Sequence, residues 1–406
     1  MSVLPVRVSV TSEVSRARRI TDGLFDRLLP EAVYDRPIPE RHRMLFYIGH
    51  LEAFDWNQVG RTILGLGAVS EELDRLFAFG IDPPAGQLPQ DRPADWSTPE
   101  TTREYVACVR RRLDPVMEDA PEEALHMAVE HRLMHAETLT YLLHNLPYAR
   151  RRIVDPPRTS PGAAPPPEPV KIPGGAATLG QERGGQFGWD NEFERHSVYV
   201  PGFAIDRYKV TNGQYLEFVK AGGQAPHYWS QRNGKWFYRG LDAEIALPAD
   251  WPVYCSHREA QSYASWAGRS LPTEAQFHRA AFGTAEGAER RYPWGDEAPD
   301  ARHGNFDFQF RDLVPVTATP AGDSAFGVSQ LVGNGWEWTS DAFGPFPGFA
   351  PRPSYAGYSA DFFDGDHYVL KGGSCVTDAR LLRASFRNWF RDQYPYAYTT
   401  FRTVEN

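Results

Sequence analysis

The feature that most constrains this fold is the proline-rich segment at residues 155–175, DPPRTSPGAAPPPEPVKIPGG. Proline lacks the backbone N–H that helices and sheets use, so a run this dense predicts neither helix nor strand. We expect a semi-rigid linker between two domains, at residues 1–154 and 176–406. The length of 406 residues supports this division, because single hydrophobic cores rarely grow so large.

Before the linker, hydrophobic residues recur at helical spacing. In the first such segment Val14, Ile20 and Leu24 stand among charged residues. The last segment begins at Pro121, followed by two glutamates, and stops before Pro147, as is typical of helix ends. The expected helices span residues 12–29, 42–64, 100–117 and 121–146. Four helices in this part of the chain predict a four-helix bundle.

After the linker, short aromatic and β-branched segments alternate with glycine, proline and asparagine turns. The expected strands lie at residues 197–205, 236–238 and 368–371, and the expected helices at 211–220, 257–266 and 273–281. Aromatic residues make up 13% of the chain, and most of them follow residue 180. The fold class predicted for the whole chain is therefore α+β in two domains, the second irregular and rich in loops.

Charge and hydropathy exclude several classes of partner. The formal net charge of −9 disfavours nucleic acid and anionic membranes, which both attract positive patches. The sequence has no apolar run near the ~18–20 residues that span a bilayer, and no secretory signal pattern at its start. Cys108, Cys255 and Cys375 have no short pairing motif. We expect a cytoplasmic protein without a nucleic-acid or membrane partner.

Two histidines in the last expected helix have metal-ligand spacing. His131 and His135 are four residues apart, so they lie one turn apart on the same helical face. The zinc-protease pattern needs a glutamate directly after the first histidine, but Arg132 stands there. His50, among apolar residues of another expected helix, is the best third ligand, because bundles build metal sites from facing helices.

Three neutral nitrogen ligands leave positions open on a metal, which suits catalysis better than a closed structural site. A histidine on an apolar helix face is, however, more often a hydrogen-bonded core residue. The spacing alone leaves both interpretations open.

The wider pattern resembles a known family. In the first domain, FYIGHLEAFDWN (46–57) and EHRLMHAETLTYLLHNLP (130–147) are similar to the DinB-like bundle of ergothioneine sulfoxide synthases. The second domain resembles the formylglycine-generating-enzyme fold, a variant of the C-type-lectin fold. The segments that carry this second resemblance are IPGG (172–175), FAIDRYKVTNGQYLEFV (203–219), GRSLPTEAQFHRAA (268–281), YPWGD (292–296), GVSQLVGNGWEWTSD (327–341), KGGSCVTD (371–378) and FRNWF with TTFR (386–402).

The resemblance implies an enzyme that uses Fe(II) and O2 to join a chalcogen atom to imidazole C2 of hercynine, the trimethylated betaine of histidine. His50, His131 and His135 match the family's iron ligands. Asn388 and Trp389 match residues that hold the betaine end. A quaternary ammonium has no N–H to donate, so an aromatic face such as that of Trp389 is a suitable partner.

Several departures from the family pattern concern the donor of the chalcogen. Phe390 stands where members that use γ-glutamylcysteine typically carry an acid, and Met134 replaces a glutamine that contacts hercynine. Gly335 replaces the valine of the usual GNVWEW segment. These changes favour an uncharged selenosugar, as in the selenoneine synthases, a divergent branch of the superfamily. Free cysteine or another thiol is the alternative donor.

Bond formation also needs a proton donor near the iron, and tyrosine has this role in relatives. Tyr396 and Tyr398 are the candidates chosen here, with ordinary aromatic packing as the alternative for each. A formylglycine-generating activity is disfavoured, because Cys375 has no partner cysteine at the expected positions, Thr377 and Leu382. Two other possibilities are a lectin-like binding protein without catalysis and a DinB-like thiol transferase. The histidine set argues against the former and the second domain against the latter.

Overall fold

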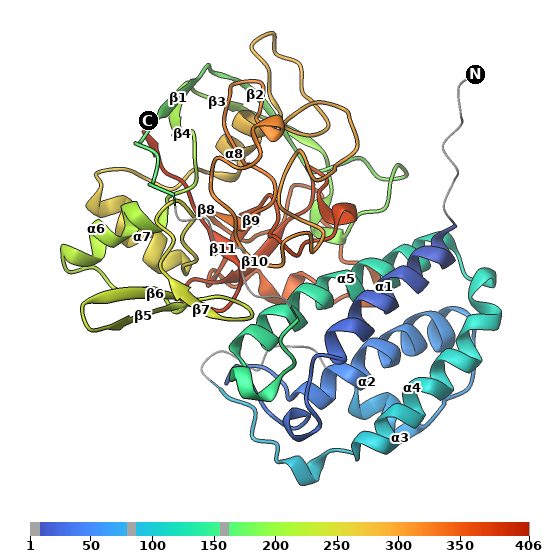
Figure 1. The fold of residues 1–406 in the computed structure, drawn as a ribbon. Helices are drawn as coiled ribbons and strands as arrows, with labels where there is room; N and C mark the ends of the chain where they lie inside the picture. Colours follow the sequence, from blue (N-terminus) through green and yellow to red (C-terminus); the bar gives the residue numbers. More distant parts are fainter. Residues whose placement is uncertain (1–8, 79–86, 155–161, 406) are drawn as a thin grey trace, which may run out of the picture. The chain divides into compact units, whose positions relative to one another are not determined.

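The computed structural model describes residues 9–78, 87–154 and 162–405, and it divides into two compact units, Met1–Asp155 and Pro156–Asn406 (Figure 1). The first unit is helical and the second combines short strands with helices. The predicted two-domain α+β architecture is confirmed. None of the described helices is long and apolar enough to cross a membrane.

The first unit is built on four long helices, as predicted. They are α1 (Val10–Phe25), α2 (Met44–Asp55), α4 (Pro99–Leu113) and α5 (Glu122–Asn145). Helix α1 packs on α5, and α2 packs on both α4 and α5 (Figure 1). The central helix α5 is buried on nearly every side, which suits a helix whose sequence has no wide polar face.

Shorter elements connect these helices. Helix α3 (Glu71–Leu76) is a single short helix between α2 and α4. The helix expected at 42–64 is α-helical only in its first part, because α2 continues as a π-helical stretch, η2 (Trp56–Ile63). The 3-10 turns of this unit are η1 (Pro30–Ala32), η3 (Pro93–Asp95), η4 (Asp114–Asp119) and η5 (Tyr148–Arg150).

Side-chain caps start three of the helices. The Ser9 hydroxyl accepts a hydrogen bond from the Ser12 N–H, and Ser70 and Thr98 do the same at α3 and α4. Each cap satisfies one of the N–H groups that a helix leaves unpaired in its first turn. These residues therefore fix where the helices begin.

Residues 162–405 of the second unit form four small sheets and three helices. The sheets have the strand orders β10-β9-β8-β11, β1-β4-β12, β5-β6-β7 and β2-β3. The strands are β1 (Pro169–Ile172), β2 (Gly175–Leu179), β3 (His196–Val200), β4 (Phe203–Asp206), β5 (Trp229–Arg232), β6 (Lys235–Arg239), β7 (Glu244–Ala246), β8 (Trp336–Ala342), β9 (His367–Lys371), β10 (Asn388–Arg391), β11 (Thr399–Thr400) and β12 (Val404–Glu405). The helices are α6 (Asn212–Lys220), α7 (His257–Trp266) and α8 (Glu274–Phe282), and 3-10 turns lie at η6 (Asp190–Glu192), η7 (Pro320–Gly322), η8 (Pro353–Tyr355), η9 (Ala360–Phe362) and η10 (Ala379–Leu381).

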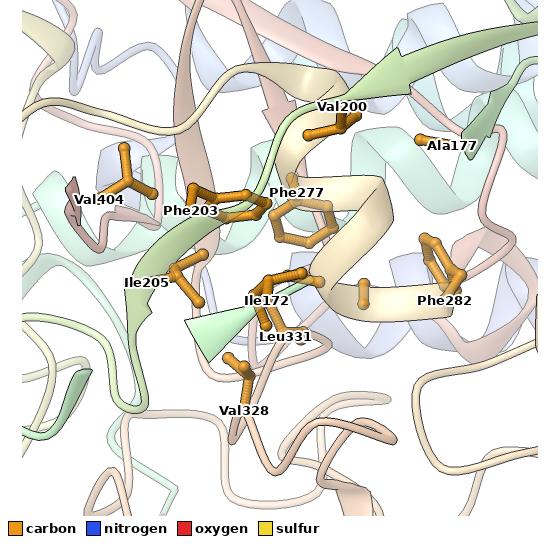
Figure 2. Packing of buried hydrophobic residues seen from close by; sticks show 12 residues of the cluster. Ile172, Ala177, Val200, Phe203, Ile205, Phe277, Phe282, Val328, Leu331 and Val404 are labelled. Atoms are coloured by element: carbon orange, nitrogen blue, oxygen red, sulfur yellow. The ribbon is translucent and has the colours of Figure 1, made fainter. Parts of the chain in front are cut away.

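An apolar cluster around α8 forms one core of this unit. Figure 2 shows Phe277 and Phe282 of α8 among Ile172, Phe203 and Leu331. These residues come from segments far apart in the chain, so the cluster joins α8 to β1 and β4. Burial of such large side chains is worth about 1.5–3 kcal/mol each.

A buried ionic group stabilises the end of the chain. Glu337 of β8 accepts hydrogen bonds from Lys209 Nζ at 2.8 Å and from Arg402 Nε at 2.6 Å, and none of the three side chains is exposed. The adjacent Trp336 and Trp338 are 2% and 0% exposed, so the tryptophans of the GNGWEW segment belong to the core.

One detail predicted for the linker and one predicted for the second domain are wrong. Pro169–Ile172 form strand β1, paired antiparallel with β4, so the proline-rich segment is not free of strands throughout. Residues 155–161 of that segment lie outside the described part of the chain. The expected strand at 197–205 is two strands, because Pro201 and Gly202 separate β3 from β4.

Candidate metal centre

The structure brings His50, His131 and His135 together inside the helical unit. His50 lies on α2, and the other two lie one turn apart on α5. One ligand atom from each of the three lies within 4.8 Å of the others, and all three side chains are buried. The ring centroids are 4.5 Å apart for His131 and His135, and 4.9 Å apart for His50 and His135. This convergence agrees with the predicted spacing.

A backbone carbonyl orients His50. Its Nδ1 lies 2.7 Å from the carbonyl oxygen of Phe77, which can only accept a hydrogen bond. Nδ1 therefore carries the proton and Nε2 keeps a lone pair. Within the described residues Nε2 is buried and has no hydrogen-bond partner, and the same holds for Nδ1 of His135. Buried nitrogens of this kind are suited to a metal ion.

The three imidazoles are neutral at physiological pH. Burial lowers the pKa of His50 to about 4, although the Phe77 carbonyl opposes the shift. Burial, reinforced by neighbouring imidazoles and Arg132, also holds the pKa values of His131 and His135 well below the usual range. Because only a neutral imidazole can ligate a metal, no proton has to leave before binding.

Aromatic rings hold two of the histidines in place. Phe54 stacks on His131 with centroids 3.4 Å apart and planes inclined by 9°. Phe46 stacks on His50 at 4.7 Å and 20°. Such close packing restricts ring rotation and gives one face of each of these two imidazoles an apolar neighbour.

A buried ionic cluster lies beside the histidines and involves all four long helices. Its members are Arg18 on α1, Glu52 and Asp55 on α2, Arg110 on α4, and Arg132 on α5. Arg132 Nη2 donates to Asp55 Oδ2 at 2.7 Å, and Arg110 Nη2 donates to Glu52 Oε1 at 2.7 Å. Arg132, which follows His131 in sequence, thus has structural partners in Asp55 and Glu52. It stands where a zinc protease carries the glutamate that acts as its base.

The donor set fits a catalytic metal. In the described parts of the chain, no carboxylate or cysteine joins the three histidines within ligand distance of one another. Three nitrogen ligands leave positions for substrate or O2, unlike the four protein ligands of a structural zinc site. The sequence indicated this histidine cluster but not the Phe77 carbonyl, because a backbone group leaves no mark in a motif.

Comparison with known families covers both units. The family model described as sulfatase-modifying factor enzyme 1-like domain matches residues 157–406, and that of the DinB superfamily matches residues 13–144. A hercynine oxygenase of Mycolicibacterium smegmatis is 36% identical over 358 residues, covering 80% of this chain and 81% of the relative. The chain belongs to the ergothioneine sulfoxide synthase superfamily.

Further relatives support this membership. A hercynine oxygenase of Mycolicibacterium thermoresistibile is 36% identical over 402 residues, covering 90% of this chain and 85% of the relative. Ergothioneine biosynthesis protein 1 of Schizosaccharomyces pombe is 25% identical over 443 residues, covering 95% of this chain and 54% of that protein. The resemblance expected from the motifs is therefore confirmed along most of the chain.

Three of the residues predicted to contact substrate, Asn388, Trp389 and Phe390, lie on β10 of the second unit. Trp389 stacks on Phe343 at 4.2 Å and 7°, with Tyr358 at 5.4 Å and Phe362 at 5.5 Å, so an aromatic cluster supports its half-buried ring. Side chains alternate along a strand, so Asn388 and Phe390 share the opposite face. The substrate roles of Asn388, Trp389 and Phe390 stay predictions.

The other candidate residues have the following surroundings. Met134 lies on α5 directly before His135 and is half-buried. Phe390 stacks on Tyr394 at 5.0 Å, and Tyr394 contacts Tyr396 edge-on at 5.1 Å, so these three rings form one aromatic row. Tyr398 stacks on a different ring, that of Tyr254, and its side chain is 1% exposed. Tyr396 and Tyr398 stay candidate proton donors.

Cys375 is a buried residue in this unit. Its Sγ lies 3.6 Å from the hydroxyl of Tyr254. The positions expected for a partner cysteine hold Thr377 and Leu382, so the sequence lacks the cysteine pair of a formylglycine-generating site.

Proposed function

We propose that this chain is a non-haem Fe(II) oxidoreductase that uses O2 to form a carbon–chalcogen bond at imidazole C2 of hercynine. The observation that carries the proposal is the buried set of three neutral histidines, His50, His131 and His135. It is supported by the relatives named hercynine oxygenase, which align with most of the chain.

The histidines would hold the metal, which supplies the electron transfer to O2 and polarises the bound imidazole. The chain's own residues then have three tasks. Phe46 and Phe54 keep water away from the ligand cluster. Trp389 offers an aromatic face to the trimethylammonium group, and Asn388 binds the carboxylate end. Tyr396 or Tyr398 provides a proton during bond formation.

For the donor we propose an uncharged selenosugar with a selenol group: one C–H bond, one Se–H bond and O2 would be consumed, and a C–Se bond, a selenoxide oxygen and water would be formed. The aromatic row of Phe390, Tyr394 and Tyr396 supports this choice, because it offers stacking surface and no charged group for a dipeptide. A thiol such as cysteine is the second candidate, favoured by the relatives named for ergothioneine biosynthesis. With a thiol, one C–H bond, one S–H bond and O2 are consumed, and a C–S bond, a sulfoxide oxygen and water are formed.

The test is mass spectrometry of products from the Fe(II)-loaded protein supplied with hercynine and O2. Parallel reactions contain a selenosugar, cysteine or γ-glutamylcysteine. We expect a hercynine adduct that contains selenium and no efficient turnover of γ-glutamylcysteine. A sulfur adduct formed from cysteine would support the second candidate. Efficient use of γ-glutamylcysteine would refute the inference drawn from Phe390, and the absence of any hercynine adduct would refute the proposed function.

A further inference from the structure

The three histidines explain how a metal is bound but not what orients the ligand from α2. We propose that helix α3 is a positioning element for the metal centre. It presents the carbonyl of Phe77 to His50, and Gly49 is the residue that lets this carbonyl approach. The inference rests on the proposed function only in taking His50 as a metal ligand.

The first step is the hydrogen bond itself. Phe77 directly follows α3, and its carbonyl oxygen lies 2.7 Å from Nδ1 of His50, with both residues buried. This contact selects the tautomer with hydrogen on Nδ1, so that Nε2 is the ligand atom. It also fixes the direction of the ring plane, together with Phe46 stacked on the imidazole.

The second step concerns Gly49, the residue before His50. A Cβ atom at this position would lie 2.5–2.6 Å from three atoms of the Phe77 ring. Real Cβ atoms do not come so close to other atoms, and the ring is fully buried, next to Trp96 and Tyr105. Only glycine therefore allows Phe77 to rest directly on α2 beside the ligand.

The third step is that α3 is held in place. A helix of six residues is not stable alone, so its position depends on contacts. Asp74, 1% exposed, accepts a hydrogen bond from the Tyr105 hydroxyl of α4 at 2.8 Å. The backbone carbonyl of Asp74 accepts a second hydrogen bond, from the Asn57 side-chain amide of η2, at 3.0 Å. Helix α3 is thus tied both to α4 and to the continuation of the helix that carries His50.

These contacts make the His50 ring part of a rigid frame. Groups that orient a metal ligand typically change metal affinity about 10–100-fold when they are lost. Helix α3 therefore acts through His50 and does not itself touch the metal.

The tautomer is tested on the full-length, metal-free protein, and the one variant needed is His50→Gln, which serves only to assign the signal. Long-range 1H–15N spectra of histidine side chains distinguish the two neutral tautomers, and assignment uses loss of the signal in His50→Gln. We expect His50 with hydrogen on Nδ1. Hydrogen on Nε2 would overturn the proposal.

Metal binding is tested with Co(II), whose visible absorption reports ligand geometry. In Gly49→Ala the new methyl group displaces Phe77, and we expect Co(II) affinity to fall about 10–100-fold with altered absorption bands. In Gly49→Ala/Phe77→Ala the methyl group occupies space left by the ring, so most of the affinity returns although the melting temperature falls further. A purely structural role of Phe77 would not move affinity and stability in opposite directions.

Gly60→Ala is the matched control. Its Cβ would meet the Trp56 ring at 3.0–3.3 Å in the same unit, and the three atoms nearest to it all belong to Trp56. We expect its Co(II) affinity to match that of the unchanged protein. If Gly49→Ala binds Co(II) as tightly as the unchanged protein, or if the double variant does not recover affinity, the proposed role of α3 is overturned while the metal site stands. Failure of the unchanged protein to bind Co(II) would overturn the proposed metal site as well.

Discussion

Two of the three histidines proposed as ligands have particular neighbours that hold their rings. Phe54 stacks on His131, whereas His50 has both the Phe46 ring and the Phe77 carbonyl. The i, i+4 pair was predictable, because helical geometry alone places His131 and His135 on one face. The position of the Phe77 carbonyl was not predictable, because it depends on how the chain directly after α3 meets α2. A glycine directly before a ligand histidine is the one signal for it in the sequence.

A residue-scale prediction concerns Trp389. Trp389→Leu keeps apolar bulk against Phe343 but removes the aromatic face proposed to contact the trimethylammonium group. We expect the dissociation constant for hercynine to rise roughly 5–30-fold, because a desolvated cation–π contact contributes about 1–2 kcal/mol. Calorimetry on the anaerobic Fe(II) protein measures this change.

Two variants control the Trp389 experiment. Trp389→Phe retains an aromatic face and should recover most of the affinity. Phe390→Leu shortens the aromatic row proposed to contact the donor, so it should alter the KM of the donor and leave the binding of hercynine unchanged. Unchanged hercynine binding in Trp389→Leu would show that the ring has only a packing role.

The ends of the long helices were largely predictable. Their caps and prolines are local signals, so the helix expected at residues 121–146 is observed as Glu122–Asn145. The π-helical stretch after Asp55 has no such signal, since it depends on the side chains packed around it. The inward direction of Arg132 was also not predicted, because its partners Glu52 and Asp55 lie on another helix.

The ionic cluster leads to a prediction about the bundle. Arg132→Met leaves Glu52 and Asp55 buried without one of their cations, although Arg18 and Arg110 remain. Removing one partner of a buried pair typically costs about 3–5 kcal/mol, so we expect a loss of this size in the free energy of unfolding. Urea denaturation followed by circular dichroism provides the measurement.

Arg103→Met is the control for the Arg132 variant. Arg103 lies on α4 with its side chain 61% exposed and pairs with Glu100 only at the surface, so its loss should change stability by less than about 0.5 kcal/mol. A similar small effect of Arg132→Met would mean that the cluster does not hold the helices together.

At the scale of the whole molecule, the division into two domains followed from the density of prolines at 155–175. The extent of the linker could not be predicted in this way, because β1 forms by pairing with β4, with Pro169 opposite Asp206. The Glu337 group likewise depends on Lys209 and Arg402, which are distant in sequence. Contacts between distant segments are the part of this fold that local patterns do not contain.

The pH dependence of stability is a property of the whole molecule, and the three buried histidines contribute to it. In the metal-free protein the buried histidines have lowered pKa values, with His50 at about 4. The unfolded chain therefore binds more protons below about pH 6.5, and the free energy of unfolding falls as pH decreases from 7 to 5. Each such histidine contributes a slope that approaches about 1.4 kcal/mol per pH unit.

Urea denaturation at several pH values between 5 and 7 tests this dependence. His131→Phe removes one of the titrating groups, so its stability should fall less steeply with decreasing pH than that of the unchanged protein. An identical slope in the two proteins would contradict the assignment of His131 as a buried neutral imidazole.

The most direct test of the central claim is the iron content of the full-length protein after anaerobic loading with Fe(II) and removal of excess metal. The account predicts about one iron per chain, and a loss of nearly all of it in His131→Ala and in His135→Ala. His144→Ala, on the same helix but outside the cluster, should retain iron like the unchanged protein. Iron content unaffected by the first two substitutions would contradict the claim that these histidines hold a catalytic metal.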